Sequence, residues 1–191
     1  MRIIAGEAKG HKLKTLKGLS TRPTPERVRE AIFNIWGFKI KNVNFLDLFA
    51  GSGAMGIEAL SRGAKFCHFN DHQQVVCRLL RENIKKCGFE DHAIITCQDV
   101  FVLIRQLARK QIKAFDIIYL DPPYDIICYE KLLVNILEAK IFNPTGMIVC
   151  ETSIKTVLQT EYVSGDLKLK ILRKNRYGDT AVWFYKLWGE E

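Results

Sequence analysis

Short apolar runs alternate with helix-type segments over most of this sequence, and this alternation constrains the fold more than any other feature. The apolar runs lie at 44–49, 65–70, 92–97, 115–120 and 146–151, with helix-type segments between them at 54–63, 72–86, 100–110 and 129–140. Several runs are nearly continuous hydrophobics, as expected for strands whose sheet is covered by helices on both faces. The alternation predicts an α/β fold built on a doubly wound, Rossmann-like parallel sheet.

The N-terminal end departs from this alternation. Two strand-like runs, at 2–6 and 11–16, flank a glycine-containing turn and predict a small hairpin. We therefore expect a basic N-terminal hairpin at 1–21, in front of a single larger domain at 22–191.

A helix and a terminal strand pair are predicted on either side of the alternating region. The stretch 21–36 favours a helix, with Thr24 as its N-cap and Pro25 at its first position. Near the C-terminus, 167–187 holds two strand-like runs joined by polar residues and Gly178. This pattern is typical of a terminal antiparallel pair.

The charge balance indicates a polyanionic partner. The 191 residues are 48% hydrophobic and 26% charged, an ordinary globular composition, but the net charge is +8. The first thirty residues hold eight cations against three acids and so carry +5 of this excess. Nucleic acid is the usual partner of such a surface, although a merely basic soluble protein fits the charge as well.

Cysteine usage and hydropathy favour the cytoplasm. None of the six cysteines forms a CxxC motif, and most fall in apolar runs, as reduced buried thiols do. The N-terminus lacks the apolar core of a signal peptide, and no run approaches the ~20 apolar residues that span a bilayer. The histidines show no metal-ligand spacing, so we predict no metal and no membrane contact.

A glycine-rich loop joins the first core run to the helix that follows it. Gly51, Gly53 and Gly56 fit the G-x-G-x-x-G pattern that brings a phosphate to a helix N-terminus. This spacing alone is compatible with NAD. Asp47, however, precedes the glycines on the strand itself, where a carboxylate would repel a pyrophosphate. It suits a ligand with an amino group and a cationic centre, such as S-adenosylmethionine (SAM).

Two more carboxylates end the next two apolar runs. Asp71 can accept both hydroxyls of an adenosine ribose, and Asp99 can reach an adenine amino group. Either residue alone could be a solvated acid. Together they lie at the carboxyl edge where open α/β sheets bind ligands, and they favour a nucleoside-containing cofactor.

The tetrapeptide Asp-Pro-Pro-Tyr at 121–124 follows the fourth core run and should lie at the same edge. Pro122 and Pro123 stiffen the backbone and remove two N–H donors, which leaves carbonyl acceptors. Asp121 adds a carboxylate, and Tyr124 offers a ring on which an extruded base can stack. These four residues are the predicted catalytic group, which would hold an exocyclic amine and aim its lone pair at a methyl group.

The motifs together resemble those of class I SAM-dependent methyltransferases and, more narrowly, the RsmD family of bacterial 16S ribosomal RNA guanine-N2 methyltransferases. DPPY marks amino-group methylation in general, and the combination with the basic N-terminus is more specific. The segments that carry the resemblance are RIIAG at 2–6, KGHKL at 9–13, RPTPERVREAIFNI at 22–35, LDLFAGSGAMGIEALSRGA at 46–64, LDPPY at 120–124 and YGDT at 177–180.

This resemblance implies a seven-stranded sheet with an antiparallel last strand, and methylation of one guanine N2 in 16S RNA with S-adenosylhomocysteine (SAH) as by-product. The cofactor residues that it implies are Asp47, Phe49, Ala50, Gly51, Gly53, Asp71, Asp99, Val100 and Thr24. The substrate would be 16S RNA or a 30S assembly particle, and the protein a monomer. The substrate residues would be Arg2, Lys9, Lys12, Arg22, Arg29 and Tyr177. Two positions depart from the family pattern: Asp71 replaces the usual Glu, and Asn70 replaces an apolar residue.

Three other functions remain open from the residues alone. A DNA adenine-N6 methyltransferase would also use DPPY, although little chain is left for a target-recognition region. A non-catalytic RNA-binding assembly protein would have no use for Asp47 and the intact glycine loop. An NAD-dependent oxidoreductase is disfavoured by Asp47 and by DPPY.

Overall fold

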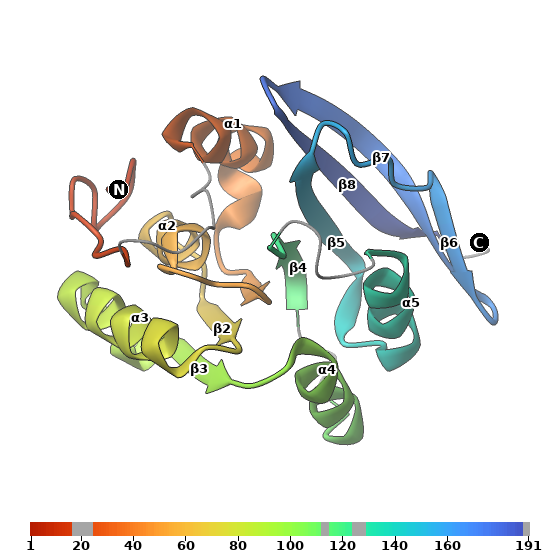
Figure 1. The fold of residues 1–191 in the computed structure, drawn as a ribbon, viewed down its shortest axis with the longest axis horizontal. Coiled ribbons are helices and arrows are strands. Elements are labelled where there is room, and N and C mark those ends of the chain that lie inside the picture. The colour runs from red at the N-terminus through yellow and green to blue at the C-terminus, as the bar shows by residue number, and fades with distance from the viewer. Residues whose placement is uncertain (17–24, 112–114, 124–128, 189–191) are drawn as a thin grey trace. The chain divides into compact units, whose positions relative to one another are not determined.

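The computed structural model describes residues 1–16, 25–111, 115–123 and 129–188 (Figure 1). The chain divides into two compact units, Met1–Gln98 and Asp99–Glu191. No helix in the described part of the chain is long and apolar enough to cross a membrane.

The first unit is a parallel βα arrangement. Its elements are α1 (Glu26–Trp36), the 3₁₀ turn η1 (Gly37–Ile40), β1 (Asn44–Asp47), α2 (Ala54–Ser61), β2 (Phe66–Asp71), α3 (Gln74–Cys87), the 3₁₀ turn η2 (Glu90–His92) and β3 (Ala93–Cys97). The strands run in the order β3-β2-β1, and both pairs are parallel. This confirms the parallel arrangement predicted from the apolar runs.

Helix α2 packs closely against strand β2 in this unit. Gly56 of α2 faces β2 so closely that a Cβ would lie 2.2 Å from Phe69 Cε1 and 2.5 Å from Cys67 Sγ. The third glycine of the G-x-G-x-x-G pattern is therefore required by helix–strand packing. Phe45 and Leu46 of β1 are completely buried.

The second unit combines one parallel strand pair with an antiparallel extension. Its elements are α4 (Val100–Arg109), β4 (Phe115–Leu120), α5 (Tyr129–Ala139), β5 (Phe142–Ser153), β6 (Glu161–Ser164), β7 (Leu167–Tyr177) and β8 (Thr180–Trp188). The order is β4-β5-β8-β7-β6, with β4 and β5 parallel and every later pair antiparallel. Helix α5 packs against α4, β6 and β7.

The described residues of the two units form eight strands, one more than the seven that were expected. The antiparallel orientation of the last strand is confirmed by the pairing of β8 with β5. The extra strand is β6, which forms a tight hairpin with β7 around Gly165 at φ 56°. The mixed α/β class is as predicted.

The N-terminal residues form a bridged turn. A single antiparallel bridge joins Arg2 to Lys12, and backbone N–H groups of Ile3 and Leu13 donate to His11 and Met1. The expected hairpin at 1–21 reaches residues beyond the described 1–16, so its full extent stays a prediction. Helix α1 begins at Glu26, which makes Pro25 its N-cap and not its first helical residue.

Candidate functional site

The glycine loop turns sharply from β1 into α2. Gly51 and Gly53 have φ values of 53° and 82°, which L side chains rarely adopt. A Cβ on Gly53 would lie 2.3 Å from Leu80 Cδ1, whereas a Cβ on Gly51 would meet no heavy atom within 4 Å. Gly53 is therefore required by packing, whereas Gly51 is favoured only by its backbone conformation.

Asp47 ends β1 beneath this loop and is almost completely buried. Its Oδ2 accepts a hydrogen bond from the Gly56 N–H at 3.3 Å. Burial raises the pKa of this carboxyl from 3.8 to about 7, with a smaller contribution from the nearby Asp71 and an opposing one from the Gly56 N–H. A buried carboxylate without a cation is costly, so Asp47 would gain from a positively charged ligand.

Asp71, at the end of β2, holds the loop from its other side. Its Oδ2 accepts from the Gly51 N–H at 3.1 Å, and its Oδ1 accepts from the Gln73 N–H at 2.9 Å. The shorter carboxylate at this position is therefore already tied to the backbone of the loop. Its predicted contact with a ribose stays a prediction.

Asn70, the second departure from the family pattern, is buried and fully used. Its Nδ2 donates to the carbonyls of Leu48 and Gln98, and its Oδ1 accepts from Thr96 at 2.9 Å. These bonds fasten β2 to the segments on both of its sides. Asn70 therefore makes three hydrogen bonds where an apolar residue would only pack. Strand β2 keeps its regular pairing with β3 at this position.

Asn83 of α3 connects the loop to the N-terminal residues. Its Nδ2 donates to the Ser52 carbonyl at 2.9 Å and to the Lys14 carbonyl at 3.0 Å, and its Oδ1 accepts from the Lys14 N–H at 2.8 Å. The side chain is completely buried. Asn83 was not predicted as a functional residue, although a polar side chain at i+3 from Leu80 on an apolar helix face was a usable signal.

The N-terminal segment (residues 1–16) is fastened to α2 by polar side chains that the sequence analysis also missed. The buried Glu58 carboxylate accepts from the Ile4 and Ala5 N–H groups at 2.8 and 3.0 Å. Ser61 accepts from the Ala8 N–H and donates to the Ala5 carbonyl. A charged residue inside an otherwise apolar helix was the signal for Glu58.

Arg29, predicted to border the substrate, is instead completely buried in α1. Its Nη2 donates to the Arg2 carbonyl at 2.5 Å, and its Nε lies 3.6 Å from Glu58. Arg29 thus helps to hold the N-terminal segment in place, and its burial does not support a direct contact with substrate.

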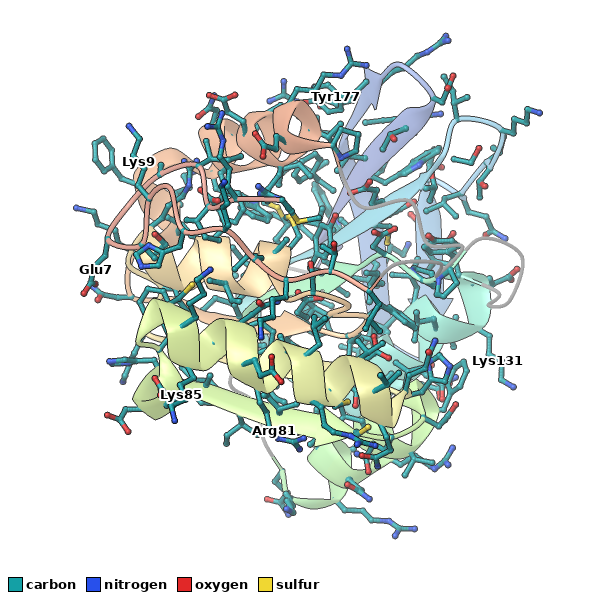
Figure 2. The ribbon with its side chains drawn as sticks, turned by 60° about the vertical axis from the view of Figure 1, so that its left-hand side comes forward. Glu7, Lys9, Arg81, Lys85, Lys131 and Tyr177 are labelled. Carbon is teal, nitrogen blue, oxygen red and sulfur yellow. The ribbon has the colours of Figure 1, made fainter. Side chains whose placement is uncertain are left out.

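The other predicted substrate cations of the first unit lie on its surface. Arg2, Lys9 and Lys12 are exposed, and the Arg2 Nε makes an exposed ion pair with Glu26 at 3.3 Å. Figure 2 shows Lys9 projecting outward from the turn of the N-terminal segment. Arg22 and Thr24 lie outside the described residues.

In the second unit, Asp99 caps helix α4. Its Oδ1 accepts from the N–H groups of Phe101 and Val102 at 2.9 and 3.1 Å, which is ordinary N-cap geometry. One carboxylate oxygen is therefore committed to the helix, and the contact with adenine remains a prediction. Val100, the first helical residue, is buried.

The described residues of the Asp-Pro-Pro-Tyr sequence follow β4 directly. Asp121 is partly buried, Pro122 is buried, and Pro123 is partly buried. They follow the carboxyl end of the fully buried β4 residues Ile118 to Leu120. Tyr124 lies outside the described residues. Tyr177, at the end of β7, is partly exposed.

Comparisons with known proteins agree with this arrangement. The model of the family described as conserved hypothetical protein 95 matches residues 1–186. "Putative rRNA methyltransferase YlbH" of Bacillus subtilis is 39% identical over 97% of this chain and 98% of its own. The Haemophilus influenzae ribosomal RNA small subunit methyltransferase D is 36% identical over 80% of this chain and 78% of its own. The solved structure of "Putative methyltransferase yhhF" from Escherichia coli matches with a TM-score of 0.81 at 26% identity, covering 100% of this chain and 99% of its own.

Proposed function

Because the chain belongs to the RsmD family of rRNA methyltransferases, we propose that it transfers a methyl group from SAM to the exocyclic N2 of one guanine in 16S ribosomal RNA. The relatives named as ribosomal RNA small subunit methyltransferase D support the choice of ribosomal RNA, and of the small subunit, as the substrate. The choice of N2 rests on the resemblance of the motifs to that family.

The residues of the glycine loop fit SAM better than a dinucleotide. Asp47 is buried and forms no ion pair with any cation of the described residues, so it favours the amino group and positive charge of SAM and opposes a pyrophosphate. When bound, SAM supplies a methyl group made electrophilic by its sulfonium. Asp47, Phe49, Ala50, Gly51 and Gly53 would bind its methionine end.

The nucleoside end of the cofactor would be bound by the carboxylates of the next strand ends. We assign the ribose to Asp71 and the adenine to Asp99, with Val100 beside it. In both residues one carboxylate oxygen or more is already held by backbone N–H groups. Such bonds fix the carboxylate before a ligand arrives, which reduces the entropy lost on binding.

The residues after β4 would hold the target amine. The Asp121 carboxylate and the carbonyls of the two prolines would accept hydrogen bonds from the N–H groups of the amine, and Tyr124 would stack on the base. Fixed acceptors stabilise the positive charge that develops on the nitrogen, and positioning supplies much of the rate. Asp121 or water then takes the proton.

One observation carries the proposal: a carboxylate is buried beneath a glycine loop in a chain of this family. A DNA adenine methyltransferase remains the alternative, since both targets are exocyclic amines. A non-catalytic RNA-binding protein is the alternative of another class.

Transfer of tritium from labelled SAM to under-methylated 16S RNA tests all three. We expect labelled N2-methylguanosine after nucleoside analysis, from naked RNA or from 30S particles. Labelled N6-methyladenine on DNA would favour the alternative enzyme. RNA binding without SAH binding or transfer would favour the non-catalytic protein. Size-exclusion chromatography of the same sample tests the expected monomer.

A further inference from the structure

We propose that the end of the β7–β8 hairpin grips RNA phosphates beside the target base. The basic tip consists of Arg173, Lys174 and Arg176, all of them exposed. The proposal rests on the proposed function, which it extends by assigning a substrate-binding surface within the second unit.

Strand register places the basic tip level with the residues that would hold the base. Leu120, the last residue of β4, pairs with Cys150 of β5, which pairs with Trp183 of β8, which pairs with Lys174 of β7. Asp121 follows Leu120 directly. The tip and the Asp-Pro-Pro sequence therefore lie at the same edge of this unit's strands.

The separation is short on the scale of an RNA chain. Three strand spacings separate β4 from β7 in the order β4-β5-β8-β7. At about 4.8 Å each they amount to about 14 Å. A few nucleotides of RNA cover this distance, so one RNA segment can place a base at Asp121 and its neighbouring phosphates at the tip.

The tip side chains are held by local contacts and so lose less freedom on binding. The Arg173 Nε donates to Asn175 Oδ1 at 2.6 Å, and the Arg176 Nε donates to the Gly178 carbonyl at 3.2 Å. The Lys174 Nζ lies 3.9 Å from the centre of the Trp183 ring. A guanidinium oriented in this way presents its remaining N–H groups to a phosphate.

The hairpin loop keeps the tip compact. Tyr177 pairs with Thr180 across a two-residue loop whose first member, Gly178, has a φ of 62°. Glycine at this position suits the tight turns that match strand twist. Figure 2 places Tyr177 at this end of the hairpin, where its ring could border the same RNA segment.

The tip cations differ from other cations of the same hairpin in their ion pairing. Arg173, Lys174 and Arg176 make no ion pair with any described side chain. The cations at the other end of the same two strands differ. Lys168 and Lys170 both lie within 4 Å of the Glu161 carboxylate, at 3.3 and 3.8 Å.

That other end supplies a matched control. Lys168, Lys170 and Lys186 (the far end) lie on the same two strands, with Lys168 and Lys170 opposite Trp188 and Lys186. The Lys170 Nζ lies 4.5 Å from the Trp188 ring, so each triple variant removes three charges and one cation–π contact. The far-end lysines differ from the tip in their distance from Asp121, in their partial burial and in the pairing of two of them with Glu161.

The experiment compares Arg173→Gln/Lys174→Gln/Arg176→Gln with Lys168→Gln/Lys170→Gln/Lys186→Gln. Binding to under-methylated 16S RNA is measured over a range of salt concentrations, alongside SAH affinity and thermal stability. We expect the tip variant to bind RNA about tenfold more weakly, with a salt slope smaller by about 2–3, and to keep its SAH affinity. The far-end variant should stay within about twofold of wild type.

Equal RNA binding by the tip variant and wild type would overturn the proposal, as would equal losses in the two variants. A wild-type protein that neither binds SAH nor transfers methyl would instead overturn the proposed function. Melting temperatures of both variants close to wild type would show that any RNA defect is local.

Discussion

Two groups of polar side chains, one in each unit, differ in their burial. In Met1–Gln98, Glu58, Asn70 and Asn83 are buried and bonded to backbone groups of distant segments. In Asp99–Glu191, the cations at the end of β7 stand exposed on a long antiparallel pair. The buried polar side chains named in the first unit hold backbone segments in place, whereas the cations named in the second unit face solvent.

This difference suggests that the two units contribute separately to function. Buried, satisfied polar groups stabilise one backbone arrangement, because leaving any of them unpaired costs about 1–3 kcal/mol. Exposed cations contribute little to stability and much to the attraction of a polyanion. Changes at the buried polar groups of the first unit should therefore alter stability, whereas changes at the exposed cations of the second unit should alter RNA affinity.

The largest effect should come from Asp121→Ala in the second unit. Loss of one fixed acceptor of the target amine should lower the rate of methyl transfer by about 10²–10³-fold. SAH affinity, measured by calorimetry, should stay within about twofold. Asp166→Ala, which changes an exposed acid of the β6–β7 loop, is the control and should transfer methyl normally. Normal turnover by the Asp121 variant would show that this carboxylate does not serve the reaction.

The converse effect, on stability alone, should come from Gly6→Ala in the first unit. A Cβ on Gly6 would lie 1.7 Å from the Ser61 carbonyl oxygen, and the φ of 82° is already unfavourable for alanine. Unfolding by urea should show a loss of about 3 kcal/mol or more. Gly10→Ala is a close match, because Gly10 has a φ of 86° but nothing within 4 Å of its Cβ position.

Gly10→Ala should therefore cost only the backbone strain, about 1–2 kcal/mol. Similar losses in the two variants would mean that the N-terminal segment moves away from α2 without penalty. The first unit would then be less firmly held than its hydrogen bonds indicate.

The sequence predicted those parts of both units that follow from local pattern. Apolar periodicity located the core strands and helices to within a few residues, since burial imposes the pattern directly. The strand β6 was missed because Glu161–Ser164 is short and only Tyr162 among its residues is buried. Its tight loop, Ser-Gly-Asp at 164–166, was the available signal.

Long-range side-chain contacts were harder to predict. The contact between Asp47 and Gly56 lies within one short motif, nine residues apart. The bonds from Asn83 to Ser52 and Lys14 span 31 and 69 residues, and no local pattern encodes them. The sequence predicts that Arg29 binds substrate, because nothing in its own helix indicates the buried Glu58 that it faces in the fold.

The third prediction concerns how the free energy of unfolding depends on pH. The folded pKa of Asp47 is about 7, raised by burial from an ordinary 3.8. Between about pH 4 and 7 the folded state therefore holds a proton that the unfolded state has released, and stability should fall as the pH rises through this window. Asp47→Asn should remove much of this fall, as measured by urea unfolding at pH 4.5, 6 and 7.5.

SAH binding provides an independent check of the same carboxyl. The ligand's ammonium group should favour the charged carboxylate, so binding at pH 6.5 should release protons, detectable by calorimetry in buffers of different ionisation enthalpy. Asp47→Asn should abolish this release and weaken SAH binding about tenfold. Asp91→Asn, at an exposed acid of η2, should change neither property.

The smallest effect should come from the exposed cations of the N-terminal segment. These cations belong to the first unit but face solvent, unlike its buried Glu58, Asn70 and Asn83. Lys9, Lys12 and Lys14 are exposed on a backbone that the first unit holds firmly. Their exchange for Glu should weaken RNA binding about fivefold and leave SAH affinity unchanged, because a surface ion pair such as Lys14 to Glu82 contributes little.

Exchange of Lys39, Lys65 and Lys85 for Glu is the control, because it makes the same change in net charge at other exposed positions of the same unit. It shows whether RNA affinity depends on where the charges lie or only on the net charge. If RNA binding falls only with the N-terminal triple, then both units contact RNA, and the rigid attachment of residues 1–16 has a functional reason. Equal losses would mean that RNA responds only to total charge. In that case the N-terminal lysines would make no specific contact with RNA, and the RNA contacts would be expected from the second unit.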